Sequence, residues 1–166
     1  MTMSLARASL LFVACLLAGT DPALADGSSL SVSAVIVSKN NCKFASGTAP
    51  AAVVTNNGTA IDPSLATTAT GTATAKFTCN GASSSATFTV TANDGAHASG
   101  PGLRRMQHAT VATEFLPYSL AFSPASATVA KGTPVTVTIT ASVLQAGFQD
   151  ALAGAYSDTV AVTVSP

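Results

Sequence analysis

Strict alternation of apolar and hydroxyl-bearing residues is the feature that most limits how this chain can fold. Val135, Val137, Ile139, Ala141 and Val143 are separated by single Thr or Ser residues. Side chains of a β-strand point alternately to opposite faces, so this spacing predicts a strand with one buried face and one solvated face. The same period recurs in residues 30–36, 73–79, 88–92, 116–122 and 160–164. No segment carries the stripe of an amphipathic helix.

Turn-forming residues separate these segments. They are Asn56-Asn57-Gly58, Asn93-Asp94-Gly95, Gly100-Pro101-Gly102 and Lys131-Gly132-Thr133-Pro134. Short strands divided by such turns predict an all-β protein with an immunoglobulin-like β-sandwich. Residues 47–69, rich in Ala, Thr, Asn and Pro, hold either one irregular strand near Ala52 or mostly loop.

The first 25 residues have the pattern of a signal peptide. Arg7 supplies positive charge, Leu10 to Leu17 form a short apolar run, and Ala23-Leu24-Ala25 is a small-x-small cleavage site. A membrane-spanning helix needs about 20 apolar residues, and Gly19 to Pro22 interrupt the run before that length. Acylation of Cys15 as a lipoprotein is an alternative with a very short apolar region. We expect export to the periplasm, followed by display on the cell surface or secretion, with no segment embedded in a membrane.

Charge gives no sign of a polyanionic partner. Without Arg7 and Asp21 of the leader, the chain keeps six basic and six acidic residues (7 − 1 of each), so its net charge stays zero. Nucleic acids and anionic membranes are bound through clustered Lys and Arg, so we expect neither as a partner. The remaining length suffices for one domain, over residues 39–166.

Two cysteines, Cys42 and Cys79, remain after the leader is removed. In an exported chain, two cysteines with no other thiol predict one disulfide. No Cys-x-x-Cys motif or neighbouring His completes a metal site, so we expect neither a metal nor a cofactor.

Several motifs occur in a particular order along the chain. An apolar strand over residues 30–37 precedes Cys42, and a threonine-rich strand ends at Cys79. Arg105-Met106 begins a later segment, and Gly154-Ala155-Tyr156-Ser157-Asp158-Thr159 opens the last strand. In these motifs the chain resembles the spore coat protein U domain family, the pilin-like subunits of archaic chaperone-usher fimbriae.

That resemblance implies a pilin fold that lacks its last strand and is completed by donor-strand complementation, a form of β-augmentation. Residues 26–38 would be the N-terminal extension that enters the next subunit. The inserted side chains would be Leu30, Val32, Ala34 and Ile36. The alternative is that this stretch is an ordinary first strand, paired within its own domain.

The resemblance also assigns a role to the last strand. Val160, Val162 and Val164 would line the acceptor groove, where a periplasmic chaperone binds before an outer-membrane usher adds the subunit. These valines would equally serve as plain core, and both roles can hold at once. Gly154, Tyr156 and Asp158 are interpreted as structural, with a tyrosine-corner-like hydrogen bond from Tyr156 to upstream backbone.

No motif of this sequence indicates an enzyme, and we expect no enzymatic activity. His97 and His108 stand in loop-like contexts, where histidines are usually solvated or capping residues. The chain has no Gly-x-Ser-x-Gly elbow, phosphate-binding loop or zinc signature. The Arg104-Arg105 pair could bind an anionic surface polymer, but solvated loop charges explain it more simply.

Three hypotheses of function follow. The first is a structural subunit of a surface fimbrium that supports adhesion or biofilm formation, with other pilin subunits, a chaperone and an usher as partners. The second is a binding module, either a tip adhesin or a stand-alone secreted sandwich. The third is a hydrolase whose site the sequence conceals.

Overall fold

The computed structural model describes residues 29–31, 42–45, 51–53, 60–64, 67–81 and 83–166. These residues form antiparallel β-sheets and one short helix, α1 (Gln145–Phe148), so the all-β prediction is confirmed. A single helical turn is too short to show an amphipathic stripe in the sequence. Within the described residues no helix is long and apolar enough to cross a membrane.

One layer is a sheet of four strands in the order β2-β4-β10-β8. Its strands are β2 (Cys42–Phe44), β4 (Ala69–Cys79), β10 (Pro134–Val143) and β8 (Ser119–Ser123). The long β4 and β10 pair over their whole shared length, with Ala73 opposite Ile139. Both alternate buried, mostly apolar residues with more exposed residues that are mostly Thr or Ser, as predicted, because only one face of this sheet meets the core.

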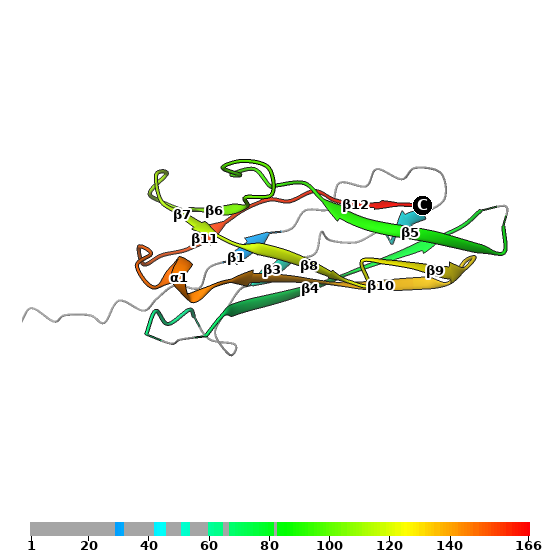
Figure 1. Cartoon of the computed structure of the whole chain (residues 1–166), viewed down its shortest axis with the longest axis horizontal. Coiled ribbons are helices and arrows are strands. Elements are labelled where there is room, and N and C mark those ends of the chain that lie inside the picture. Colours follow the sequence, from blue (N-terminus) through cyan, green and yellow to red (C-terminus); the bar gives the residue numbers. More distant parts are fainter. Residues whose placement is uncertain (1–28, 32–41, 46–50, 54–59, 65–66, 82) are drawn as a thin grey trace, which may run out of the picture.

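The other layer consists of two three-stranded sheets. The first, in the order β12-β5-β9, contains β12 (Val162–Ser165), β5 (Ser85–Ala92) and β9 (Ser126–Ala130). The second, in the order β11-β6-β7, contains β11 (Tyr156–Ser157), β6 (Arg105–His108) and β7 (Phe115–Pro117). Figure 1 shows β6, β7 and β11 at one end of the elongated molecule, with β5 and β12 toward the other end.

Aromatic side chains join the two layers. Phe77 of β4 and Phe88 of β5 are fully buried, and their rings meet edge to face with centroids 4.8 Å apart. Phe44 of β2 extends this stack, 5.8 Å from Phe77. Burial of each large side chain stabilises the fold by roughly 1.5–3 kcal/mol. This contact across the layers makes the domain a sandwich.

One predicted strand is two strands. Residues 116–122 alternate without a break, but the structure divides them into β7 and β8, which pair with β6 and β10 in different sheets. The break falls at Tyr118, directly after Pro117. Pro117 stands opposite Arg105 of β6, and the Tyr118 N–H still donates to Arg104 O at 3.2 Å, so the chain changes sheets at Tyr118 itself.

The disulfide prediction is confirmed. Cys42 and Cys79 stand directly opposite each other in the β2–β4 ladder and are joined by an S–S bond of 2.05 Å. Both residues are buried in the core. The bond therefore attaches the short β2 to the long β4.

The N-terminal part of the described chain forms a separate ribbon. β1 (Ser29–Ser31) pairs antiparallel with β3 (Ala51–Val53), with Leu30 opposite Ala52. The structure thus places a short strand in the segment 47–69, whose topology the sequence left open. The predicted signal peptide, Val32, Ala34, Ile36 and the turn at residues 56–58 lie outside the described residues.

Candidate functional site

The last segment of the chain contains the valines that were expected to line an acceptor groove. Among the strands that the structure describes, β12 lies at the outer edge of its sheet and pairs with β5. Val160 is fully buried, and Val162 and Val164 are 1% and 3% exposed. Val160 precedes β12 instead of belonging to it. In the single chain these side chains are part of the core.

Asp158 lies between β11 and β12, four residues before β12 begins. Its carboxylate is buried and accepts hydrogen bonds from three groups, one on Tyr118 and two in the loop after β5. Tyr118 Oη donates to Oδ2 at 2.6 Å, and the backbone N–H of Ala96 donates to Oδ1 at 2.9 Å. His97 Nδ1 lies 3.0 Å from the same Oδ1. Burial of a carboxylate destabilises a fold unless hydrogen-bond donors surround it. The three donors therefore allow Asp158 to be buried at this position.

Tyr118 is held in its neutral form by this environment. Burial, and then the hydrogen bond and negative charge of Asp158, raise the pKa of the Tyr118 hydroxyl well above its ordinary value. Arg104 opposes the shift only weakly. The hydroxyl therefore acts as a permanent donor to Asp158 at physiological pH.

Gly95 lets the loop after β5 approach Asp158. Its φ of +85° is a conformation that L side chains rarely adopt. A Cβ at this position would also fall on the Asp158 carboxylate. Asn93 supports the same loop, since its Oδ1 accepts hydrogen bonds from Gly95 N at 3.2 Å and from Ala161 N at 2.9 Å.

His108 is not a loop residue, and the expectation of a loop setting is wrong. It lies in β6, is 7% exposed, and pairs with Tyr156 in the ladder. Its Nδ1 accepts from the backbone N–H groups of Thr110 and Val111, so the histidine caps the following turn. With Nδ1 accepting, Nε2 carries the proton and donates to Ala153 O at 3.2 Å.

Gly154 and Tyr156 are explained by the same contacts. A Cβ on Gly154 would overlap the His108 ring, so the motif requires glycine at this point. Tyr156 meets the His108 ring edge to face at 4.9 Å, and its hydroxyl donates to Leu152 O at 2.8 Å. Burial, and then the charge of Glu114, raise the pKa of Tyr156. The hydrogen bond to backbone four residues upstream has the form expected of a tyrosine corner.

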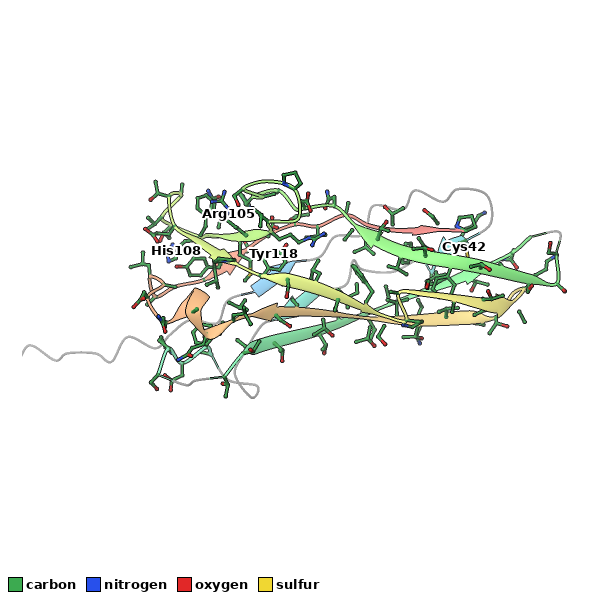
Figure 2. The ribbon with its side chains drawn as sticks, viewed as in Figure 1. Cys42, Arg105, His108 and Tyr118 are labelled. Carbon is green, nitrogen blue, oxygen red and sulfur yellow. A yellow bond between two sulfur atoms is a disulfide. The ribbon has the colours of Figure 1, made fainter. Side chains whose placement is uncertain are left out.

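Arg104 and Arg105 are not solvated loop charges. Arg104 donates to Asn93 O and Ala92 O, at 2.9 and 3.2 Å, and lies 3.6 Å from the carboxylate of Asp94. Arg105 donates to His97 O at 3.1 Å, and its guanidinium carbon lies 4.1 Å from the Phe115 ring centroid. Both side chains hold the loop that carries Gly95 and His97. Figure 2 shows Arg105, His108 and Tyr118 together at one end of the molecule, with Cys42 toward the other.

The side chains around Asp158 make hydrogen bonds to one another and to the backbone, and these contacts hold the fold together. Within the part of the chain that the structure describes, no group of three or more His, Cys, Asp or Glu could hold a metal ion. The apolar notch near the cluster has a volume of about 390 Å³ and is bordered by Pro117, Tyr118, Ser142 and Leu144. The Tyr118 hydroxyl is already engaged by Asp158.

The sequence motif contains Gly154, Tyr156 and Asp158 but not their partners. The sequence pattern places Tyr118 only in an alternating strand and Gly95 only in a turn. A usable signal existed, because a tyrosine at a buried position of an alternating strand needs a partner for its hydroxyl. The partner is Asp158, which lies 40 residues away in the sequence, so the residues around Tyr118 do not identify it.

Of the four predicted donor residues, the structure describes only Leu30. Leu30 lies in β1, which pairs with β3 of the same chain. Val32, Ala34 and Ile36 are outside the described residues. Donation of this segment to another subunit stays a prediction.

Comparison with known proteins gives one clear match. The sequence matches the Spore Coat Protein U domain over residues 28–163. No curated protein matches the chain significantly. A solved structure described as "Chaperone-tip adhesin complex is vital for synergistic activation of CFA/I fimbriae biogenesis" shares 14% identity with a TM-score of 0.38. The overlap covers 60% of this chain and 35% of that chain, and is too partial to carry a functional conclusion.

Proposed function

The chain belongs to the Spore Coat Protein U domain family, and from this membership we propose that it is a structural subunit of a secreted surface fimbrium. The subunit polymerises by donor-strand complementation and supports adhesion or biofilm formation. A signal peptide at residues 1–25 directs it to the periplasm. A periplasmic chaperone and an outer-membrane usher then assemble it with other copies or related pilin subunits.

The position of β12 is the observation that best supports this proposal. Within the described residues β12 is the outermost strand of β12-β5-β9, so a strand added beside it would extend the sheet. The Asp158 cluster anchors the chain directly before β12. Because β12 is held in place at its N-terminal end, an added donor strand would pair with it in a single register.

The N-terminal extension supplies a suitable donor in its sequence. Leu30, Val32, Ala34 and Ile36 alternate with small or polar residues except at Val35. Each of the three larger side chains would contribute roughly 1.5–3 kcal/mol on full burial, before ordering costs are subtracted. Backbone hydrogen bonds along the added strand would contribute further, so the links between subunits would be long-lived.

An unheated denaturing gel of the exported protein, co-produced with a candidate periplasmic chaperone, tests the proposal. The intact chain should give a ladder that collapses on heating. Val32→Asp should abolish the ladder, because a carboxylate would enter an apolar groove. Ser33→Asp is the matched control, since the neighbouring residue points to the opposite face of the strand and should leave the ladder intact.

A stand-alone binding sandwich is the second candidate, and one observation favours it. β1 pairs with β3 of its own chain, as a self-contained domain would have it. That candidate predicts monomer only in all three proteins on the same gel, with equal stability and solubility. Such a result would remove donor-strand assembly as the mechanism.

A further inference from the structure

Charged side chains are separated along the long axis of the domain. Among the described residues, one end contains three exposed lysines, Lys43, Lys76 and Lys131. The rest of the domain contains both described arginines and five carboxylates, which are Asp62, Asp94, Glu114, Asp150 and Asp158. The lysines thus give three positive charges, and the other side chains leave three negative charges (2 − 5 = −3). Lys39 and Asp26, one of each sign, lie outside the described residues. A net charge of zero conceals this separation.

The three lysines lie at the end of the sandwich that contains the disulfide, and we call them the lysine end. Lys43 and Lys76 are diagonal neighbours on the outer face of the β2–β4 ladder. Lys131 belongs to the turn between β9 and β10, which is held at this end because Gly132 N donates to Cys79 O at 2.9 Å. None of these lysines forms an ion pair with a described residue. Their charges are therefore available to a partner.

Three carboxylates gather at the opposite end around an apolar notch of about 80 Å³. Asp62 lies between two lining residues, Glu114 directly precedes β7, and Asp150 directly precedes another lining residue. We call these three the carboxylate end. Figure 1 shows α1 and the segment 60–64 at this end, far from the turn between β9 and β10. The notch is lined by Ile61, Pro63, Leu116, Phe148, Ala151, Leu152, Ala153, Gly154 and Tyr156. An apolar centre with a polar rim is the usual composition of a protein interface.

The two ends are too far apart to neutralise each other within one molecule. Seven residues of β4 separate Lys76 from Ala69, which pairs with Val143 at the far end of the ladder (76 − 69 = 7). At about 3.4 Å per residue this distance is about 24 Å. The Debye length at physiological ionic strength is only about 8 Å, so each end can attract an opposite charge on a neighbour.

The direction of the strands would bring opposite ends together in a fibre. The chain enters β2 at Cys42, so everything that precedes Cys42 joins the domain at the lysine end. β12 runs toward that same end, since Ser165 pairs with Thr89 and Val162 with Ala92. A donor strand antiparallel to β12 would leave the groove at the carboxylate end. The subunit that supplies this strand would then present its lysine end there.

We propose that the lysine end of one subunit binds the carboxylate end of a second copy of this chain. The inference rests on the proposed function and adds to it a contact between folded domains, separate from strand addition. The partner is a second copy because the two ends carry equal and opposite charge. Attraction between the ends orients an arriving subunit and speeds its addition, and salt weakens this effect.

Charge reversal at each end tests the contact. The lysine-end variant carries Lys43→Glu with Lys131→Glu, and the carboxylate-end variant carries Asp62→Lys with Asp150→Lys. All four side chains are exposed, so the urea midpoints should match that of the natural chain. Growth of the heat-labile ladder from purified chaperone–subunit complexes is followed on unheated gels. Each variant should grow about tenfold more slowly at low salt, because like charges then face each other. A combined variant with all four changes should grow at the natural rate, since opposite charges meet again.

A second control separates the position of the charges from their sum. Thr72, Thr74, Thr87 and Thr89 are exposed on the outer faces of β4 and β5. Their replacement by Glu changes the net charge as much as the lysine-end variant does (4 × −1 against 2 × −2). This control should grow as fast as the natural chain. In about 1 M salt, where the Debye length is about 3 Å, the natural chain should slow to the rate of the single-end variants.

The outcomes distinguish this contact from the proposed function. Equal growth of all variants would overturn the contact and leave fimbrial assembly in place. A slow combined variant would also overturn it, because each end would then serve some other partner, such as the chaperone or an anionic polymer. Equal slowing in the threonine control would assign the effect to net charge and overturn the contact as well. No ladder from the unsubstituted chain would remove the proposed function and this contact together.

Discussion

Tyr118 donates a 2.6 Å hydrogen bond to the buried carboxylate of Asp158, 40 residues farther along the chain. The bond ties the break between β7 and β8 to the break between β11 and β12. Each of these breaks is a point where the chain leaves one sheet and enters another. One hydrogen bond thus links two places where the alternating pattern alone does not decide the path of the chain.

Removal of the Tyr118 hydroxyl tests how much this hydrogen bond contributes to stability. Tyr118→Phe should lower the free energy of unfolding by about 1.5–3 kcal/mol, because a buried carboxylate loses one of its donors. Urea denaturation followed by circular dichroism measures the change. Tyr156→Phe is the control, since it removes a neutral bond to Leu152 O and should cost about 0.5–1.5 kcal/mol. An equal or larger loss in the control would contradict the assigned role of Asp158.

Substitution of Gly95 separates backbone strain from crowding. Gly95→Ala places a Cβ on the Asp158 carboxylate and should destabilise the domain by about 2–5 kcal/mol, the sum of strain and overpacking. Gly102→Ala is the matched control, with a φ of +74° and nothing within 4 Å of its added Cβ. It should cost only about 1–2 kcal/mol. Urea unfolding of both variants gives the difference, and equal losses would show that the contact with Asp158 is unimportant.

Alkaline pH should weaken the fold through the tyrosines. The folded state raises the pKa of Tyr118 and of Tyr156 above their unfolded values, so it holds protons that the unfolded chain releases. The resulting stability is fully present below about pH 10 and is lost as the pH rises above it. The urea midpoint should therefore fall above that pH, and it should fall less steeply in Tyr118→Phe. An unchanged alkaline slope in that variant would contradict the shifted pKa.

Loss of the disulfide should lower the free energy of unfolding of this domain substantially. On the chain-entropy relation, a bond that closes the loop between Cys42 and Cys79 stabilises the fold by about 4 kcal/mol. Reductant should therefore lower the urea midpoint of the natural chain substantially. The double variant Cys42→Ala with Cys79→Ala should start from a low midpoint and show no further response to reductant. A reductant effect of equal size in both proteins would point to a different cause.

The sequence was most informative where the structure is regular. Alternation located β4, β5 and β10, since each buries one face over many residues. It was misleading at residues 116–122, where the period continues through Pro117 although the ladder changes partner. It also missed β9, in which no residue is fully buried and the apolar signal is correspondingly weak.

By itself the sequence determined the long strands β4, β5 and β10, the disulfide and the motif Gly154-x-Tyr156-x-Asp158, because burial on a strand repeats every two residues and is a local rule. Only the tertiary structure decided the partners. Asp158 meets Tyr118 and His97 across 40 and 61 residues, and His108 meets Ala153 across 45. Such pairs leave no periodic trace in the chain, since they depend on which sheet each strand joins. The packing of the two layers makes that choice.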